Sequence, residues 1–175
     1  MFAAEIRKRR ITQIRSYPQW QWHLDEVVVK INGKFCYLWR AVDYEGEVLE
    51  AVVTAKRDKA AALKLLKRVM RKYGRPKVIV TDRLRAYSAA MDEIGVADRH
   101  AVGRRLNNRA ENSHQSLRRR ERAMQRFRSM RALQKFSSVH DQVQNHFNLE
   151  RHLVARRIYK QRRLIALAEW RSLAA

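Results

Sequence analysis

The first half of the chain carries a strand-like pattern of hydrophobic positions. From Trp22 to Ile31 the sequence is rich in Val and other residues that favour a pleated, buried surface, and Asn32-Gly33 then supplies the two positive-φ positions of a tight hairpin turn. A second apolar run over 34–42 returns from that turn, and a third follows over 48–53 after a turn at 43–46. This region therefore predicts a three-stranded antiparallel meander.

The hydrophobic period becomes helical after Asp58. This residue is a suitable N-cap, and Gly74 with Pro76 provides the stop signal, so the pattern predicts one helix between them. Residues 78–81 form a short apolar run typical of a strand buried on both faces. A strand reached through a helical crossover is normally parallel to its neighbour, and if that neighbour is the first strand, Asp25 and Asp82 come close together.

The rest of the chain predicts helices with one more short strand. We expect a helix over 83–94, a strand near 98–102, a polar loop over 103–108, and a long helix from Asn108 that packs through Ala110, Leu117 and Met124. A further helix has Leu133, Phe136, His140, Val143 and Phe147 at helical spacing, and 156–173 predicts one more amphipathic helix. The order of elements predicts an α/β fold of the ribonuclease H type: a mixed five-stranded sheet, flanking helices and a helical C-terminal extension.

The charge indicates a polyanionic partner. The chain has 39 Lys and Arg against 17 Asp and Glu, a formal charge of +22 over 175 residues, which makes nucleic acid the default partner. A membrane-surface protein would carry the same charge, but the sequence shows no apolar run of roughly 20 residues and no cleavable signal pattern, so we expect a soluble, cytoplasmic protein. The single cysteine, Cys36, excludes an intrachain disulfide framework.

Three acidic residues stand where carboxylates are unexpected: Asp25 inside the first strand, Asp82 at the end of the fourth, and Glu111 in an arginine-rich helix. Converging carboxylates repel one another without cations, and Mg²⁺, with Mn²⁺ as a substitute, prefers such oxygen ligands. Two such ions could support an in-line phosphoryl displacement. Simpler roles remain open: a solvent-facing acid for Asp25, a helix cap for Asp82 and an ion pair with Arg118 for Glu111. Glu26 should point to the opposite face, solvated or salt-bridged.

Three motifs resemble the catalytic core of bacterial insertion-sequence transposases of the DDE class. They are His-Leu-Asp-Glu at 23–26, Val-Thr-Asp at 80–82 followed by Ala-Tyr at 86–87, and the stretch from 106 to 124 with Asn-Asn-Arg-Ala-Glu-Asn-Ser-His at its start. The resemblance implies an integrase-like core over 21–150 that cuts DNA at element ends and joins the freed 3′ hydroxyl to a target. It also implies Asp25, Asp82 and Glu111 as catalytic residues and metal ligands.

The resemblance also implies how the chain is organised and what it binds. Residues 1–20 are expected to be a basic linker remnant without the helix-turn-helix of the family, and 151–175 a basic helical tail. Expected partners are DNA, as element ends and target, and a second copy of the chain, with no membrane and no small-molecule substrate. The expected location is the bacterial cytoplasm, in association with the nucleoid.

Basic residues around Glu111 are expected to contact DNA phosphates. These are Arg104, Arg105, Arg109, His114, Arg118, Arg119, Arg120 and Arg122. The run 118–120 could also be a solvated helix face, but its place beside the acidic residues of a chain with charge +22 favours phosphate contact. Two alternative functions stay open at this point: a metal-dependent nuclease of the same fold, and a decayed remnant that binds DNA without catalysis.

Overall fold

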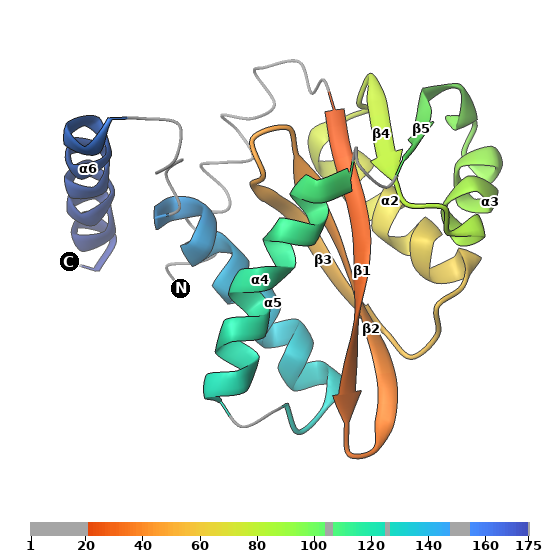
Figure 1. Cartoon of the computed structure of the whole chain (residues 1–175), viewed down its shortest axis with the longest axis horizontal. Helices are drawn as coiled ribbons and strands as arrows, with labels where there is room; N and C mark the ends of the chain where they lie inside the picture. The colour runs from red at the N-terminus through yellow and green to blue at the C-terminus, as the bar shows by residue number, and fades with distance from the viewer. Residues whose placement is uncertain (1–20, 104–106, 125–126, 148–154, 175) are drawn as a thin grey trace.

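A five-stranded mixed sheet forms the centre of the molecule (Figure 1). The computed structural model describes residues 21–103, 107–124, 127–147 and 155–174, and of these the side chains of 109, 173 and 174 are left aside. The strands are β1 (Gln21–Ile31), β2 (Lys34–Asp43), β3 (Val48–Thr54), β4 (Val78–Thr81) and β5 (His100–Val102), in the spatial order β3-β2-β1-β4-β5. Strands β1, β2 and β3 pair antiparallel, whereas β4 pairs parallel to β1 and to β5. The predicted meander and crossover are confirmed.

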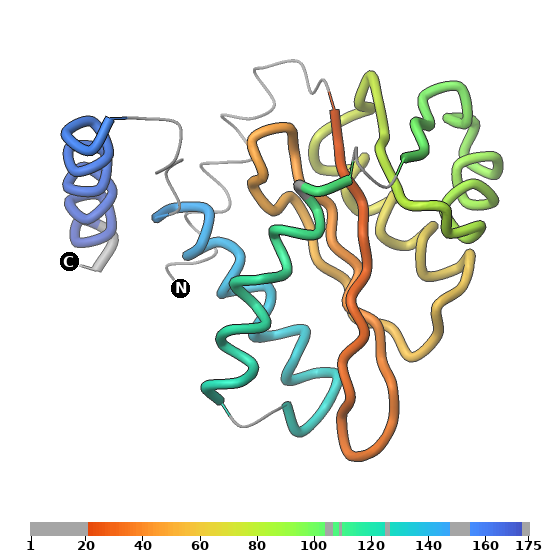
Figure 2. The backbone as a smooth tube through the Cα atoms, in the orientation of Figure 1, coloured from red at the N-terminus to blue at the C-terminus, as the bar shows by residue number. Residues whose placement is uncertain are grey.

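Helices cover both faces of this sheet. They are α2 (Lys59–Tyr73), α3 (Arg85–Glu93), the 3-10 helix η1 (Ala97–Arg99), α4 (Asn108–Ala123), α5 (Met130–Phe147) and α6 (Arg156–Ala174). Helices α2 and α3 lie on one face and α4 and α5 on the other, as the tube in Figure 2 also shows. Local signals fix the ends of α2, since Asp58 accepts a hydrogen bond from the Ala61 amide at 3.0 Å and Gly74 ends the helix with φ 81°.

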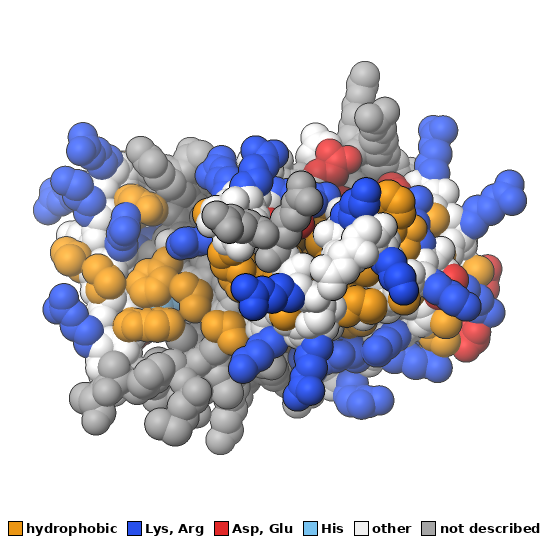
Figure 3. All heavy atoms as spheres, turned by 90° about the horizontal axis from the view of Figure 1, so that it is seen from below, with side chains coloured by type: hydrophobic (Ala, Val, Ile, Leu, Met, Phe, Trp, Pro, Cys, Tyr) orange, Lys and Arg blue, Asp and Glu red, His pale blue; other side chains and the backbone are white. Residues whose placement is uncertain are grey.

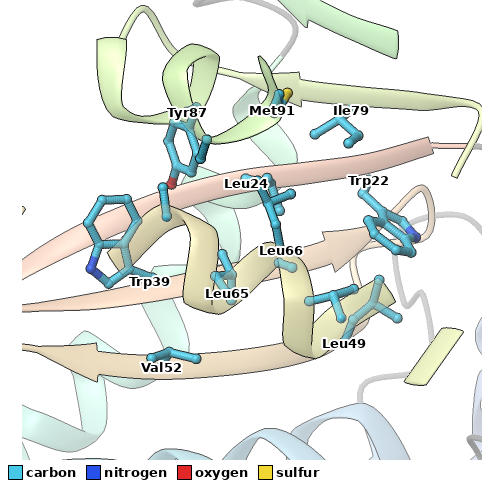
Figure 4. Close-up of a cluster of buried hydrophobic side chains, with 14 of the residues drawn as sticks. Trp22, Leu24, Trp39, Leu49, Val52, Leu65, Leu66, Ile79, Tyr87 and Met91 are labelled. Carbon is cyan, nitrogen blue, oxygen red and sulfur yellow. The ribbon is translucent and has the colours of Figure 1, made fainter. Parts of the chain in front are cut away.

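The face covered by α2 and α3 is an apolar core (Figure 4). Because successive strand residues point to opposite faces, Trp22 and Leu24 of β1 point here and pack with Leu65 and Leu66 of α2. All four side chains are fully buried. Tyr87 of α3 belongs to the same core, and its ring meets Trp39 edge to face with centroids 5.5 Å apart.

The opposite face combines a smaller apolar cluster with buried polar groups. Arg40 of β2 is fully buried, pairs with Asp141 of α5 at 2.7 Å and donates to the carbonyl oxygen of Ser113 of α4. The predicted helix is confirmed as α5, and Phe136 packs half-buried against the apolar cluster. The buried residues of the helix are Leu133, Ser137, Asp141, Gln142, Asn145 and His146. A buried guanidinium requires an acceptor, and that requirement turns the polar side of α5 inward.

Amide side chains of α5 also cover the open edge of β3. Asn145 accepts from the Val48 amide and donates to the Val48 carbonyl, both at 2.9 Å, and Gln134 does the same with the Val53 amide and the Ala51 carbonyl. These side chains occupy the hydrogen-bonding groups that an additional strand would use. The helix thereby blocks edge-to-edge pairing at β3.

Two further expectations concern helices α4 and α6. Ala110 and Leu117 of α4 are buried as predicted, but Met124 is 44% exposed, because α4 ends at Ala123 and the chain turns away there. The predicted C-terminal helix is confirmed as α6, which touches α5 where Phe147 and Trp170 have ring centroids 5.5 Å apart. Among the helices that the structure describes, none is both long enough and apolar enough for a membrane crossing.

Candidate active site

Two of the three predicted acids meet where β1 and β4 run side by side. The parallel register places His23 opposite Val80, and Asp25 and Asp82 each follow that pair by two residues. Carboxylate oxygens of Asp25, Asp82 and the neighbouring Glu26 all lie within 4.8 Å of one another. The predicted proximity of Asp25 and Asp82 is confirmed, and it follows from the crossover through α2.

Asp25 faces helix α4. Its Oδ2 lies 3.2 Å from Nε2 of His114, which is 7% exposed. Burial lowers the pKa of His114, while the contact with Asp25 opposes part of that shift, so the neutral ring is favoured near pH 7. The start of α4 is fixed beside this contact, because Nδ2 of the Asn107 side chain donates to the Leu24 carbonyl oxygen at 2.8 Å. The imidazole therefore orients the Asp25 carboxylate.

Asp82 connects β4 to α3. Its Oδ1 accepts a hydrogen bond from the backbone amide of Leu84 at 3.0 Å, which holds the carboxylate at the turn before the helix. Its Oδ2 lies 3.9 Å from Nη2 of Arg57. The cap-like role that the sequence left open thus coexists with membership of the acidic cluster. One oxygen is oriented by the backbone and the other faces the cluster.

Glu26 is the cluster member that the sequence did not nominate. Its side chain is 2% exposed, Oε1 accepts from Nε of Arg57 at 2.6 Å and also from Nη2, and Oε2 accepts from the Tyr87 hydroxyl at 2.9 Å. Burial raises the pKa of Glu26, and the hydrogen bonds and charge of Arg57 offset only part of that increase. The expected opposite face and salt bridge are confirmed, because Tyr87 belongs to the α2–α3 side. Solvation is excluded by the burial.

Glu111 does not belong to this group of three among the described residues. It lies in the first turn of α4 with an exposed side chain and lines a hollow of about 360 Å³ together with His114, Gln115, Arg118, Arg119 and Arg122. Because His114 follows Glu111 by one helical turn, lines the hollow and contacts Asp25, the hollow lies near Asp25. The third ligand role of Glu111 stays a prediction.

The predicted DNA-binding residues divide into four sets. Arg118 is half-buried and bonds to Glu121 at 2.8 Å and to the Val28 carbonyl at 2.6 Å, so it anchors α4 on β1. Arg119, Arg120 and Arg122 are exposed. Arg104, Arg105 and the Arg109 side chain lie outside the described residues. His114 is buried against Asp25, and that position favours orienting the carboxylate over contacting DNA.

The donor set fits a divalent cation. Asp25 and Asp82 provide hard carboxylate oxygens at the separation needed for a shared ion, and Glu111 stands on the neighbouring helix. The oxygens of Glu26 are already engaged by Arg57 and Tyr87, so this carboxylate is the poorest candidate ligand in the cluster. The sequence analysis did not identify Arg57 as a site residue either. Its contact with Glu26 depends on where the connection between β3 and α2 places the side chain.

The fold and the paired aspartates define a ribonuclease H-like core of the integrase type. The structure is similar to the HTLV-2 integrase catalytic core domain in complex with magnesium in its dimeric form, with a TM-score of 0.56, 16% identity and coverage of 76% of this chain and 89% of that one. It is also similar to the catalytic core domain of BIV integrase, with a TM-score of 0.53, 17% identity and coverage of 76% and 86%. The predicted fold class is confirmed.

A family model described as a DDE domain matches residues 19–150. The chain belongs to this family, the DDE domain of insertion-sequence transposases. It is similar to the transposase for the insertion sequence-like element IS431mec of Staphylococcus aureus and to that for element IS257 in transposon Tn4003, each 33% identical over 103 residues. Both matches cover 56% of this chain and 46% of the relative, so the chain spans about half the length of the curated relatives it matches.

Proposed function

We propose that this chain is the catalytic core of a DNA transposase that cuts the ends of its element and joins the freed 3′ hydroxyl to target DNA. The observation that carries the proposal is the meeting of Asp25 and Asp82 within 4.8 Å, where Asp25 of β1 lies beside the end of the parallel strand β4, in a DDE-family chain. The relatives named as transposases support the reaction type, and the charge of +22 supports DNA as the substrate. The bacterial cytoplasm, in association with the nucleoid, is the location that we propose for this reaction.

The metal proposed for this site is Mg²⁺, with Mn²⁺ as a substitute, held by Asp25, Asp82 and Glu111. When bound, such ions supply charge stabilisation for the attacking and leaving oxygens of a phosphoryl displacement. The chain's own residues orient the ligands: His114 holds Asp25, and the Leu84 amide holds Asp82. The magnesium bound in the HTLV-2 core domain, which shares the fold, supports the choice of ion.

A basic groove continues from the hollow beside Glu111 to the β1–β2 turn. This hairpin groove has a volume of about 1030 Å³ and is lined by Val28, Lys30, Asn32, Gly33, Phe35, Arg118, Glu121, Arg122, Met124, Phe127 and Arg128. Its lining contains four basic residues and one acidic residue, and it shares Arg118 and Arg122 with the hollow. Figure 3 views the molecule from this end and shows Lys and Arg side chains predominating over acidic ones. We infer that DNA backbone follows this groove away from the aspartates.

A second copy of the chain is the proposed protein partner, because the two ends of an element must be handled together. The HTLV-2 core domain described in a dimeric form supports this arrangement. Light scattering of the chain with and without DNA carrying two element ends tests it. A complex with two chains is the expected result, and a single chain on both ends contradicts it.

The test of the proposed function is metal-dependent cleavage and joining by Asp25→Asn and Asp82→Asn. Each variant loses a carboxylate ligand, so we expect activity to fall about a hundredfold or more, while DNA binding is kept because repulsion of phosphate decreases. Asp98→Asn, at an exposed acid of η1, is the matched control with wild-type rates. Cleavage at the wild-type rate by either variant contradicts the assignment of Asp25 and Asp82 to the active site. Cleavage without joining to a second DNA indicates a nuclease instead.

A further inference from the structure

We propose that the Glu26–Arg57 ion pair sets the affinity of the Asp25–Asp82 site for its divalent cation. The pair contacts the site through Asp82. Neither Glu26 nor Arg57 is one of the three proposed metal ligands, which are Asp25, Asp82 and Glu111. This inference rests on the proposed function, because it takes Asp25 and Asp82 as the residues that hold the metal.

The geometry fixes Arg57 between two carboxylates. Arg57 directly precedes Asp58, the N-cap of α2, so its backbone is held at the start of that helix. Its guanidinium binds Oε1 of Glu26 through Nε and Nη2, and Nη2 also lies 3.9 Å from Oδ2 of Asp82. One positively charged group thus contacts an acid that is 2% exposed and stands beside a proposed metal ligand.

Tyr87 completes the fixation of Glu26. Its hydroxyl points towards β1 in Figure 4 and donates to Oε2 of Glu26 at 2.9 Å. The Tyr87 ring is fully buried in the α2–α3 core against Trp39, so this donor has little freedom to leave. Both oxygens of Glu26 are therefore engaged by the protein. A cation at the cluster finds its available carboxylates in Asp25 and Asp82.

The charges then determine how strongly the site attracts a cation. Three carboxylates within 4.8 Å attract a cation together, and the Arg57 guanidinium cancels one of their three negative charges. Arg57 is 42% exposed, so solvent weakens its repulsion of a metal ion but does not remove it. The positive charge of Arg57 accordingly offsets the negative charge of Glu26, so Glu26 adds little net attraction for a metal ion although it lies next to the site.

The two halves of the pair should shift metal affinity in opposite directions. Arg57→Gln removes the positive charge and frees Oε1 of Glu26, so divalent cations should bind about tenfold more tightly. Glu26→Gln keeps an oxygen for the Tyr87 hydroxyl but leaves Arg57 unpaired beside Asp82, so binding should weaken about tenfold. The double variant should return to within about threefold of wild type, because the two charge changes cancel.

The experiment measures Mn²⁺ binding to the full chain without DNA, by the electron paramagnetic resonance signal of free Mn²⁺ at fixed ionic strength. The matched control is Lys59→Gln, at the exposed Lys59–Glu93 pair on the same side of the sheet, which should stay within about twofold of wild type. Arg57→Lys keeps the charge and should also stay close to wild type. If Arg57→Gln fails to fold, Glu26→Gln keeps the test decisive, because the proposal requires it to weaken Mn²⁺ binding and a purely structural pair does not.

Opposite shifts in the two single variants, with cancellation in the double variant, support the proposal. Shifts in the same direction, or no shift beyond the control, overturn it and leave the pair with a purely structural role. Asp82→Asn separates this outcome from failure of the proposed function. If Asp82→Asn binds Mn²⁺ as wild type does, the metal site itself is wrong. If Asp82→Asn loses Mn²⁺ while Arg57→Gln does not tighten it, only the role of the pair is wrong.

Discussion

The two faces of the sheet are stabilised by different chemistry. On the α2–α3 face, large apolar side chains such as Trp22, Leu24 and Leu66 exclude water without a directional requirement. On the α4–α5 face, a buried ion pair between Arg40 and Asp141 and amide contacts to β3 lie among the apolar groups. The comparison shows that one face supplies most of the apolar core, whereas the other positions the helix that carries Glu111 and His114.

Directional contacts suit this positioning task. Arg40 contacts α4 and α5 at once, and such contacts lose their geometry when a helix slides, whereas apolar packing tolerates small shifts. Buried ion pairs contribute little net stability compared with apolar residues of similar volume. We therefore expect substitutions of the polar contacts on the α4–α5 face to separate stability from activity, and substitutions of the apolar side chains on the α2–α3 face to change both together.

The largest expected effect on stability comes from removing one partner of the buried Arg40–Asp141 ion pair. Asp141→Ala leaves the Arg40 guanidinium buried without its carboxylate, and the free energy of unfolding should fall by about 3–5 kcal/mol in urea titrations. The double variant Arg40→Met with Asp141→Leu should regain most of that stability yet cleave DNA more slowly, because α4 loses its contact at Ser113. A double variant with full cleavage activity contradicts the positioning role.

On the apolar face, Leu66→Ala should lower the free energy of unfolding by about 2–5 kcal/mol, since it leaves a cavity between α2 and the sheet. Leu66→Met, which conserves volume, should cost less than about 1.5 kcal/mol. For both variants the cleavage rate should follow the folded fraction measured by circular dichroism. A catalytic loss far beyond the unfolded fraction would show that this face also positions the site.

A smaller effect is expected at the covered strand edge. Asn145→Ala leaves the amide and carbonyl of Val48 without their side-chain partners, so the free energy of unfolding should fall by about 1–3 kcal/mol. Lys135→Ala, an exposed position on the same helix, serves as the control in the same titration. Concentration-dependent association should increase in the Asn145 variant alone, because β3 regains an open edge. Equal behaviour of the two variants contradicts this role of Asn145.

The smallest expected effect tests the exposed side of α4. Replacing Arg119 and Arg122 by Gln should lower the slope of log affinity for DNA against log salt by about two units, at about 0.9 per phosphate contact. Replacing Lys64 and Lys67, exposed on α2, should leave the slope unchanged. Filter-binding titrations across salt concentrations measure both. Equal slopes for the two variants would make the arginines ordinary solvated surface.

Much of the fold follows from local sequence signals. The Asn32-Gly33 turn adopts φ of 49° and 80°, as its type requires, and the cap at Asp58 sets the crossover that brings Asp82 beside Asp25. These features depend on residues close in sequence or on general rules of handedness. They were therefore predictable without coordinates.

The buried polar contacts could not be predicted in the same way. The burial of Asp141 in α5 depends on Arg40, about a hundred residues earlier, and the hydrophobic spacing of the helix does not indicate it. The engagement of Glu26 depends on two partners, Arg57 and Tyr87, which lie on separate elements. Such contacts are set by tertiary placement, for which a single sequence carries no direct signal.

The most direct test of the central claim is metal-dependent cleavage by Glu111→Gln at saturating Mg²⁺, compared with Glu93→Gln at an exposed acid of α3. The claim is that α4, held by the polar face, presents the third carboxylate to the aspartates of β1 and β4. It predicts cleavage at least about a hundredfold slower in Glu111→Gln, with DNA binding retained and Glu93→Gln like wild type. Wild-type cleavage by Glu111→Gln would contradict it.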